Sequence, residues 1–148
     1  MDIHVTPIAT GATACAVDAL RLLWPRYTPE DMVRVIDQEL RPNGYCLAGI
    51  RDHDAPVAAA VLGYRIQHSL WLGKSLYVVD IATLPEWRGR GFGDQLMAWA
   101  EREARRLSCA AVHLDSGVGQ DRAAAHRLYM RHHYRIGCHH FVKVLSEA

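Results

Sequence analysis

A strand-like segment that runs into a glycine-rich loop, which in turn opens a long helix, is the feature that most constrains this chain. The segment is residues 76–84, the loop carries Gly89, Gly91 and Gly93, and the helix is expected over residues 91–107. Glycine permits backbone conformations and close approaches that a side chain would block. Successive N–H groups of such a loop, followed by the positive end of a helix dipole, form a concave anion site. The sequence therefore predicts a phosphate-binding loop between a strand and a helix.

Helical patterns precede and follow this unit. Apolar residues recur at helical spacing over residues 12–24. A second helix begins at Thr28-Pro29, with Thr28 as its cap, and ends at Pro42-Asn43-Gly44. A last helix is expected over residues 121–132.

Strand patterns complete the fold prediction. Strands are expected over residues 2–8, 45–50, 57–66, 76–84, 111–114 and 136–145. Asp52-His53-Asp54 is expected to form a hairpin turn. Within the strand over residues 76–84, Asp80 is expected to share a face with Val78 and Ala82, because alternate side chains of a strand point to the same side. Hairpins come first and β-α-β crossovers come last. The predicted fold class is α/β (α+β), a mixed, mostly antiparallel central sheet flanked by helices on both faces.

Composition excludes several classes of protein. The 148 residues fit one domain, 1–148, and 17 basic residues nearly balance 16 acidic ones, which argues against a broad nucleic-acid-binding surface. We expect no membrane association, because no apolar run approaches ~18 residues and no export signal opens the chain. The four cysteines are far apart, as expected of reduced thiols in a cytoplasmic protein.

Three phosphate-binding patterns compete for the loop. The dinucleotide fingerprint G-x-G-x-x-G fails, because Asp94 stands where its third glycine belongs. The P-loop pattern fails around Gly73-Lys74-Ser75, because its first glycine would fall at His68. The pattern [RQ]-x-x-G-x-[GA] is satisfied at every fixed position by Arg88, Gly91 and Gly93.

That third pattern is the acyl-CoA loop of the GNAT superfamily of N-acetyltransferases, which this chain resembles. The resemblance extends to Ala125-His126-Arg127-Leu128-Tyr129, which is similar to the later helix of the family, and the element order agrees over nearly the whole chain. It departs at Asp121-Arg122, where many members have an asparagine, and at His133-Tyr134, where glycine and phenylalanine are usual. The resemblance implies an acyltransferase that moves an acetyl group from acetyl-CoA to an amine by direct attack in a ternary complex.

The resemblance also implies roles for particular residues. The pantetheine arm of acetyl-CoA would pair with the backbone of Ile81, Ala82 and Thr83. The pyrophosphate would bind the N–H groups of the loop residues Arg88, Gly89, Arg90, Gly91, Phe92 and Gly93. Tyr129 would protonate the departing thiolate. Asp80 is the first candidate for the base that accepts the amine proton, and His126 is the second.

Several alternatives stay open at this point. A non-catalytic CoA-binding regulatory module would keep the same loop, and Asp80 could be a structural carboxylate. The acceptor is a small-molecule or peptide amine of unknown identity, and a homodimer is possible. Trp24, Tyr27 and Trp71 are candidates for the aromatic wall of its site, and His139 or His140 for its lining. We expect no metal site, because no metal-ligand spacing appears among the nine histidines and four cysteines.

Overall fold

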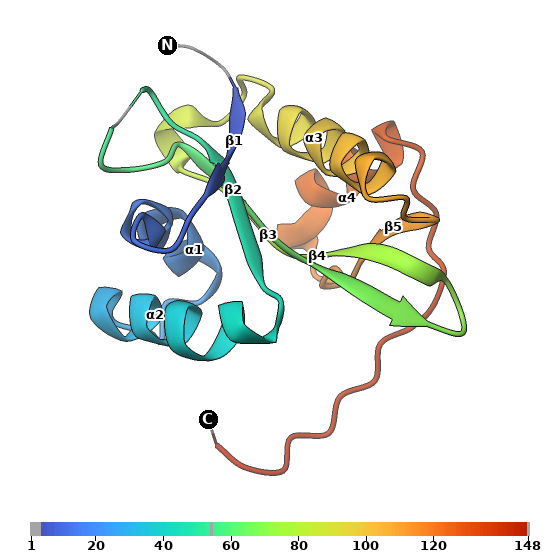
Figure 1. Cartoon of the computed structure of the whole chain (residues 1–148). Coiled ribbons are helices and arrows are strands. Elements are labelled where there is room, and N and C mark those ends of the chain that lie inside the picture. The colour runs from blue at the N-terminus through green and yellow to red at the C-terminus, as the bar shows by residue number, and fades with distance from the viewer. Residues whose placement is uncertain (1–3, 54, 148) are drawn as a thin grey trace. The chain divides into compact units, whose positions relative to one another are not determined.

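Five strands form one mixed sheet in the order β1-β2-β3-β4-β5 (Figure 1). The strands are β1 (Val5–Ile8), β2 (Cys46–Ile50), β3 (Ala60–Ser69), β4 (Gly73–Thr83) and β5 (Ala111–Leu114). The first four pair antiparallel, and β5 pairs parallel with β4. This computed structural model describes residues 4–53 and 55–147. The predicted fold class is therefore confirmed, whereas Asp54 of the predicted turn lies outside the described residues.

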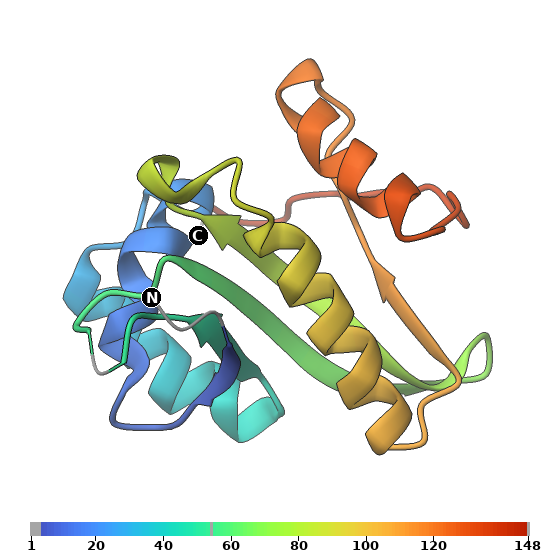
Figure 2. The same ribbon diagram turned by 90° about the horizontal axis from the view of Figure 1, so that it is seen from above.

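Helices cover both faces of this sheet (Figures 1 and 2). One face packs against α1 (Val17–Leu23) and α2 (Pro29–Val35), in a core that includes Leu20, Met32 and Leu47. The opposite face packs against α3 (Phe92–Arg106), in a core that includes Leu62 and Leu96. Figure 2 shows α3 lying lengthwise along the sheet. The two apolar faces of the sheet explain why β2 and β3 read as nearly continuous hydrophobic runs.

The start and end of α2 follow from its sequence. Thr28 Oγ1 accepts a hydrogen bond from the backbone N–H of Asp31 at 3.1 Å, and Pro29 occupies the first turn, as predicted. The helix continues through a π-helical turn (Ile36–Leu40) and a 3-10 turn (Arg41–Asn43), and it ends at Gly44 with φ of 97°. The predicted boundary at Pro42-Asn43-Gly44 is therefore confirmed.

A β-bulge interrupts β4 at Val79. Gly63 of β3 pairs with Asp80, but the next residue, Tyr64, pairs with Val78, so Val79 is an extra residue in β4. One extra residue moves all later side chains of the strand to the other face. Val78 accordingly packs in the core against α3, whereas Ala82 packs in the core against α1 and α2. The prediction that Asp80 shares a face with Val78 was wrong, because the alternation of side chains restarts at the bulge.

The chain divides into two units, and the second begins at Asp115. It contains a 3-10 turn (Gln120–Arg122) and α4 (Ala123–Arg131). The predicted strand over residues 136–145 was wrong: this segment is irregular, and Phe141 is 93% exposed. A strand needs a ladder partner, and the described residues of this unit contain no other strand. A single domain over residues 1–148 stays a prediction. None of the helices described is both long enough and apolar enough to cross a bilayer.

Candidate active site

Asp80 is a buried carboxylate, 8% exposed, on the face of β4 that packs against α1 and α2. Trp24 Nε1 donates a hydrogen bond to Asp80 Oδ1 at 2.6 Å, and the Tyr45 hydroxyl donates one to Oδ2 at 2.7 Å. Each carboxylate oxygen thus has one fixed donor and keeps a further lone-pair position. The two neutral donors hold the carboxylate in one orientation without neutralising its charge.

Local backbone features place these two donors. Trp24 directly follows α1, where its backbone N–H donates to the carbonyl of Leu20 at 3.0 Å. Tyr45 comes immediately before β2 and reaches across the sheet over Gly63, the residue that pairs with Asp80. A Cβ atom on Gly63 would overlap the Tyr45 hydroxyl. The glycine therefore provides the space in which Tyr45 contacts Asp80.

The ionisation of this cluster follows from its burial. Burial raises the pKa of Asp80, and the hydrogen bonds from Tyr45 and Trp24 oppose that rise without cancelling it. Burial also raises the pKa of Tyr45 well above its usual value, and the negative charge of Asp80 adds to this effect. Tyr45 consequently stays protonated and can only donate to Asp80. The result is a carboxylate that binds a proton more strongly than an exposed one.

Two adjoining depressions open beside Asp80 and share Leu40, Tyr45, Val79 and Asp80 in their linings. We call the first, of about 240 Å³, the apolar lobe; its other lining residues are Leu20, Trp24, Arg26, Tyr27, Met32, Val35 and Ile36. We call the second, of about 340 Å³, the polar lobe; its other lining residues are Glu39, Asn43 and Arg65. Together they form the Asp80 pocket, a concave site with a buried ionisable group of the kind that binds small molecules.

The glycine-rich loop lies between β4 and α3, as predicted. Gly89 and Gly91 have φ values of 76° and 79°, a backbone region that other residues rarely adopt. Gly91 is the N-cap of α3 and makes no side-chain cap hydrogen bond. Among the described residues, no acceptor is found for the backbone N–H groups of residues 89–93. These N–H groups and the positive end of the α3 dipole form an anion site.

The arginines of the loop are held by local contacts. Arg88 Nε donates to the carbonyl oxygen of Thr83 at 3.3 Å. The Arg90 guanidinium lies 4.6 Å from the centre of the Trp87 ring, and Trp87 stacks on Phe92, which is buried against the sheet. Both cations therefore stay on the same loop as the open N–H groups, where they add positive charge.

The end of β4 has one free edge. On one side, β3 pairs with β4 as far as Thr83. On the other side, β5 pairs with β4 only from Ser75 to Val78. Within the first unit, Ile81, Ala82 and Thr83 therefore have no strand partner on the side of β5. An extended molecule with amide groups can pair with such an edge.

Tyr129 and His126 both lie on α4, in the second unit. Burial raises the pKa of Tyr129, which keeps its hydroxyl protonated at neutral pH, and Ser116 is its hydrogen-bond partner. His126 Nε2 lies 3.0 Å from Ser116 Oγ and 2.8 Å from the carbonyl oxygen of Gly117. A carbonyl oxygen can only accept, so Nε2 carries the proton and donates it. This nitrogen is therefore not available as a base.

A family model described as the acetyltransferase (GNAT) family matches residues 15–134. The chain belongs to this family. The match includes the glycine-rich loop, Asp80 and Tyr129. The resemblance first drawn from the loop pattern is thereby confirmed.

Two curated relatives are N-acetyltransferases. Aminoalkylphosphonate N-acetyltransferase of Salmonella typhimurium is 34% identical over 82 residues, which cover 55% of this chain and 50% of that protein. Thialysine N-epsilon-acetyltransferase of Bos taurus is 29% identical over 106 residues, which cover 64% of this chain and 57% of that protein. The chain thus spans about half the length of the curated relatives it matches.

Solved structures of two N-acetyltransferases share the fold. Glucosamine-6-phosphate N-acetyltransferase of Arabidopsis thaliana superposes with a TM-score of 0.75 at 16% identity, over 99% of this chain and 100% of that one. An aminoglycoside N-acetyltransferase in complex with CoA superposes with a TM-score of 0.75 at 15% identity, over 98% of this chain and 95% of that one. At these identities the likeness concerns the fold alone.

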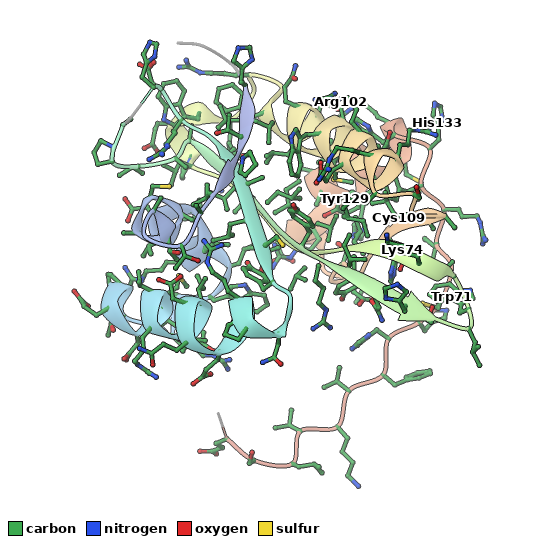
Figure 3. All side chains as sticks on the ribbon, viewed as in Figure 1. Trp71, Lys74, Arg102, Cys109, Tyr129 and His133 are labelled. Atoms are coloured by element: carbon green, nitrogen blue, oxygen red, sulfur yellow. The ribbon has the colours of Figure 1, made fainter. Side chains whose placement is uncertain are left out.

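Three aromatic residues of this GNAT chain were candidates for the wall of the acceptor site, and two of them line the Asp80 pocket. Trp24 and Tyr27 do so, but Trp71 does not. Trp71 lies at the turn between β3 and β4, at the end of the hairpin opposite to α1 and α2 (Figure 3). It is 61% exposed, and its ring contacts that of His113. Trp71 is therefore not part of this pocket, because β3 and β4 extend into a longer hairpin than the pattern indicated.

Sequence reasoning missed Tyr45 as a site residue and Trp24 as a donor to Asp80. Gly63, inside a run of strand-forming residues, was the available signal, because a strand glycine often marks a close approach or a bulge. His139 and His140 belong to the second unit, and their expected role stays a prediction. Among residues 4–53 and 55–147 no group of three or more metal-binding side chains occurs.

Proposed function

We propose that this chain is an N-acetyltransferase that transfers the acetyl group of acetyl-CoA to a primary amine in a ternary complex. The observation that carries the proposal is the order of features along β4 and the loop after it. Asp80, the free edge at residues 81–83 and the open N–H groups at residues 89–93 follow one another within 14 residues. A base, a strand edge and an anion site are the parts that this reaction needs.

We assign the cosubstrate to the second half of this stretch. The N–H groups of residues 89–93, with Arg88 and Arg90, bind the pyrophosphate of CoA. The free edge of Ile81, Ala82 and Thr83 pairs with the amide groups of the pantetheine arm. A backbone N–H near Ile81 or Ala82 donates to the carbonyl oxygen of the thioester as negative charge develops there.

Asp80 is our choice for the base, in preference to His126. Its raised pKa and its two fixed donors favour proton uptake from an amine, directly or through a water molecule. The proton on His126 Nε2 points toward a carbonyl oxygen, which favours a structural role for this histidine. Tyr129 is proposed as the acid that protonates the thiolate, from its match to the Leu-Tyr pair of the family and from its raised pKa.

The experiment that tests this function combines binding with turnover. Calorimetry measures binding of CoA and acetyl-CoA, and a thiol reagent measures CoA release with a panel of amines. We expect binding of both ligands and amine-dependent thiol release. Absence of binding would refute the proposal. Binding without amine-dependent release would favour the alternative, a non-catalytic CoA-binding regulatory module.

The cellular setting belongs to the same proposal. The four cysteines are unpaired thiols, which suits a reducing compartment, and we propose the cytoplasm. The acceptor is a small molecule or a peptide. A homodimer stays a prediction, which the mass of the protein in solution will test.

A further inference from the structure

The Asp80 carboxylate has no positively charged partner. Its two hydrogen-bond donors, Trp24 and Tyr45, are neutral, and no basic side chain of the described residues forms an ion pair with it. A buried carboxylate without a cation is unfavourable unless a ligand or a proton compensates it. Because Asp80 lines the pocket, a ligand can reach it. A cationic group such as an ammonium, supplied by the molecule that binds there, would compensate this carboxylate.

The apolar lobe surrounds that position with hydrocarbon and aromatic side chains. Leu20, Met32, Val35, Ile36 and Leu40 line it, together with the aromatic rings of Trp24 and Tyr27. The only carboxylate in this lining is Asp80. A ligand with one ammonium group and an apolar body buries both parts here, whereas a ligand with several ammonium groups leaves the others without counterions.

The polar lobe does not supply a second strong cation site. Its carboxylate, Glu39, has a side chain that is 62% exposed and lies 3.9 Å from Arg34 Nη1. An exposed and partly paired carboxylate binds an ammonium group only weakly. Each lobe also has one arginine in its lining, Arg26 in the apolar lobe and Arg65 in the polar lobe. The guanidinium of Arg26 lies over the Tyr27 ring, and that of Arg65 lies over the Tyr77 ring.

We propose that the acceptor of this chain is a primary amine on a compact apolar body of aromatic size, that is, an arylalkylamine-like molecule. This inference rests on the proposed function and names its substrate class. The ammonium group gives one proton to Asp80, from which it passes to solvent. The neutral nitrogen then forms a bond to the acetyl carbon, and the bond from that carbon to sulfur breaks. The departing thiolate takes a proton from Tyr129 and leaves as the thiol of CoA, and Tyr129 is protonated again by the second proton that the nitrogen loses. The volume of the apolar lobe, about 240 Å³, suits such a compact body.

A panel of amines tests the substrate class. We would measure kcat/KM with acetyl-CoA for phenylethylamine, tryptamine, ethylamine, spermidine, kanamycin and 2-aminoethylphosphonate. We expect the two arylalkylamines to exceed each of the others by at least about tenfold, because the apolar body contributes binding that the others lack. Equal or higher values for spermidine, kanamycin or the phosphonate would overturn the inference while leaving the proposed function in place.

A pair of matched variants tests the location. Leu40→Glu adds a charge to the lining of the pocket, and Leu22→Glu adds the same charge to a leucine of α1 that does not line it. The two leucines are 38% and 44% exposed, so both variants should fold. We expect Leu40→Glu to raise the KM for phenylethylamine at least about tenfold with an unchanged Kd for CoA, and Leu22→Glu to change neither.

Two further results would also refute the inference. Equal KM values for phenylethylamine in both variants would place the apolar body elsewhere. A preference for hexanoyl-CoA over acetyl-CoA, abolished by Leu40→Glu, would assign the apolar lobe to the acyl chain instead. Failure of the proposed function is recognised separately, because it removes binding of CoA itself.

Discussion

Replacing Tyr45 with phenylalanine removes one hydroxyl group, which donates a hydrogen bond of 2.7 Å to Asp80 Oδ2. That bond lowers the pKa of Asp80 against the larger effect of burial. A hydrogen bond to a charged group contributes about 1.5–3 kcal/mol, and one pKa unit corresponds to about 1.4 kcal/mol. Loss of this bond should therefore raise the pKa of Asp80 further, because the charged carboxylate loses about 1.5–3 kcal/mol of stabilisation. Asp80 would then be protonated, and unable to accept a proton, over a wider range of pH.

The assay is the pH dependence of kcat/KM, which reports the pKa of an essential base in the free enzyme. We expect the acidic limb of the Tyr45→Phe profile to move upward, so that kcat/KM at a fixed pH on that limb falls by about ten- to a hundredfold, with activity recovering at higher pH. The same amine must be used throughout, because its own ionisation adds to the profile. Recovery at high pH separates this effect from damage to the fold, which no pH change would repair.

Tyr64→Phe is the matched control for this prediction. Tyr45 and Tyr64 are both 7% exposed, but Tyr64 packs on the opposite face of the sheet, against α3. Its replacement should leave the acidic limb in place. If the limb of Tyr45→Phe does not move, or if both variants move it equally, Asp80 is not the base whose ionisation limits the reaction.

Three more predictions follow from the same geometry. Asp80→Asn should abolish turnover. The thermal midpoint of this variant should also rise relative to that of the wild type as the pH increases from about 4 to neutral. The reason is that the folded-state pKa of Asp80 lies above its unfolded value of about 3.9, so the wild type loses stability as pH rises through that interval; an unchanged difference between the two midpoints would contradict this. Gly91→Ala should lower the free energy of unfolding by about 1–2 kcal/mol, measured by urea unfolding, and should weaken CoA binding, measured by calorimetry. The control Gly11→Ala, at a glycine with a φ of 95°, should lower the free energy of unfolding but leave CoA binding unchanged. Tyr129→Phe should lower kcat about 100-fold, and Tyr134→Phe, which removes a hydroxyl from a neighbouring ring, should not; similar rates for both variants in the thiol assay would exclude Tyr129 as the acid.

Most of the fold could be predicted from local patterns. The Thr28 cap, the end of the second helix at Gly44 and the passage from β4 through the glycines into α3 are each encoded in a few adjacent residues. The segment 136–145 could not be predicted in this way. Its apolar residues suit a strand, but a strand also needs a partner for its backbone, and the sequence of the segment does not say whether one is present.

The candidate site shows the same division. The loop glycines were predictable because their spacing is a local pattern. The surroundings of Asp80 were not, because Val78 and Val79 are both apolar and give no sign that one of them is an extra residue. The hydrogen bonds from Trp24 and Tyr45 span 56 and 35 residues. Contacts of that separation depend on the register of the sheet, which hydrophobic patterns fix only when the strand is regular.

The bulge at Val79 also governs how the specificity of this pocket can be engineered. Before it, even-numbered positions of β4 such as Leu76 point toward α3, and after it even-numbered positions such as Ala82 point toward α1 and α2. A β4 that lacked Val79 would pair regularly with β3, with Val78 still opposite Tyr64 and Asp80 still opposite Gly63 on the face of α1 and α2. Deletion of Val79 should therefore remove one lining residue of the Asp80 pocket without turning the carboxylate to the other face.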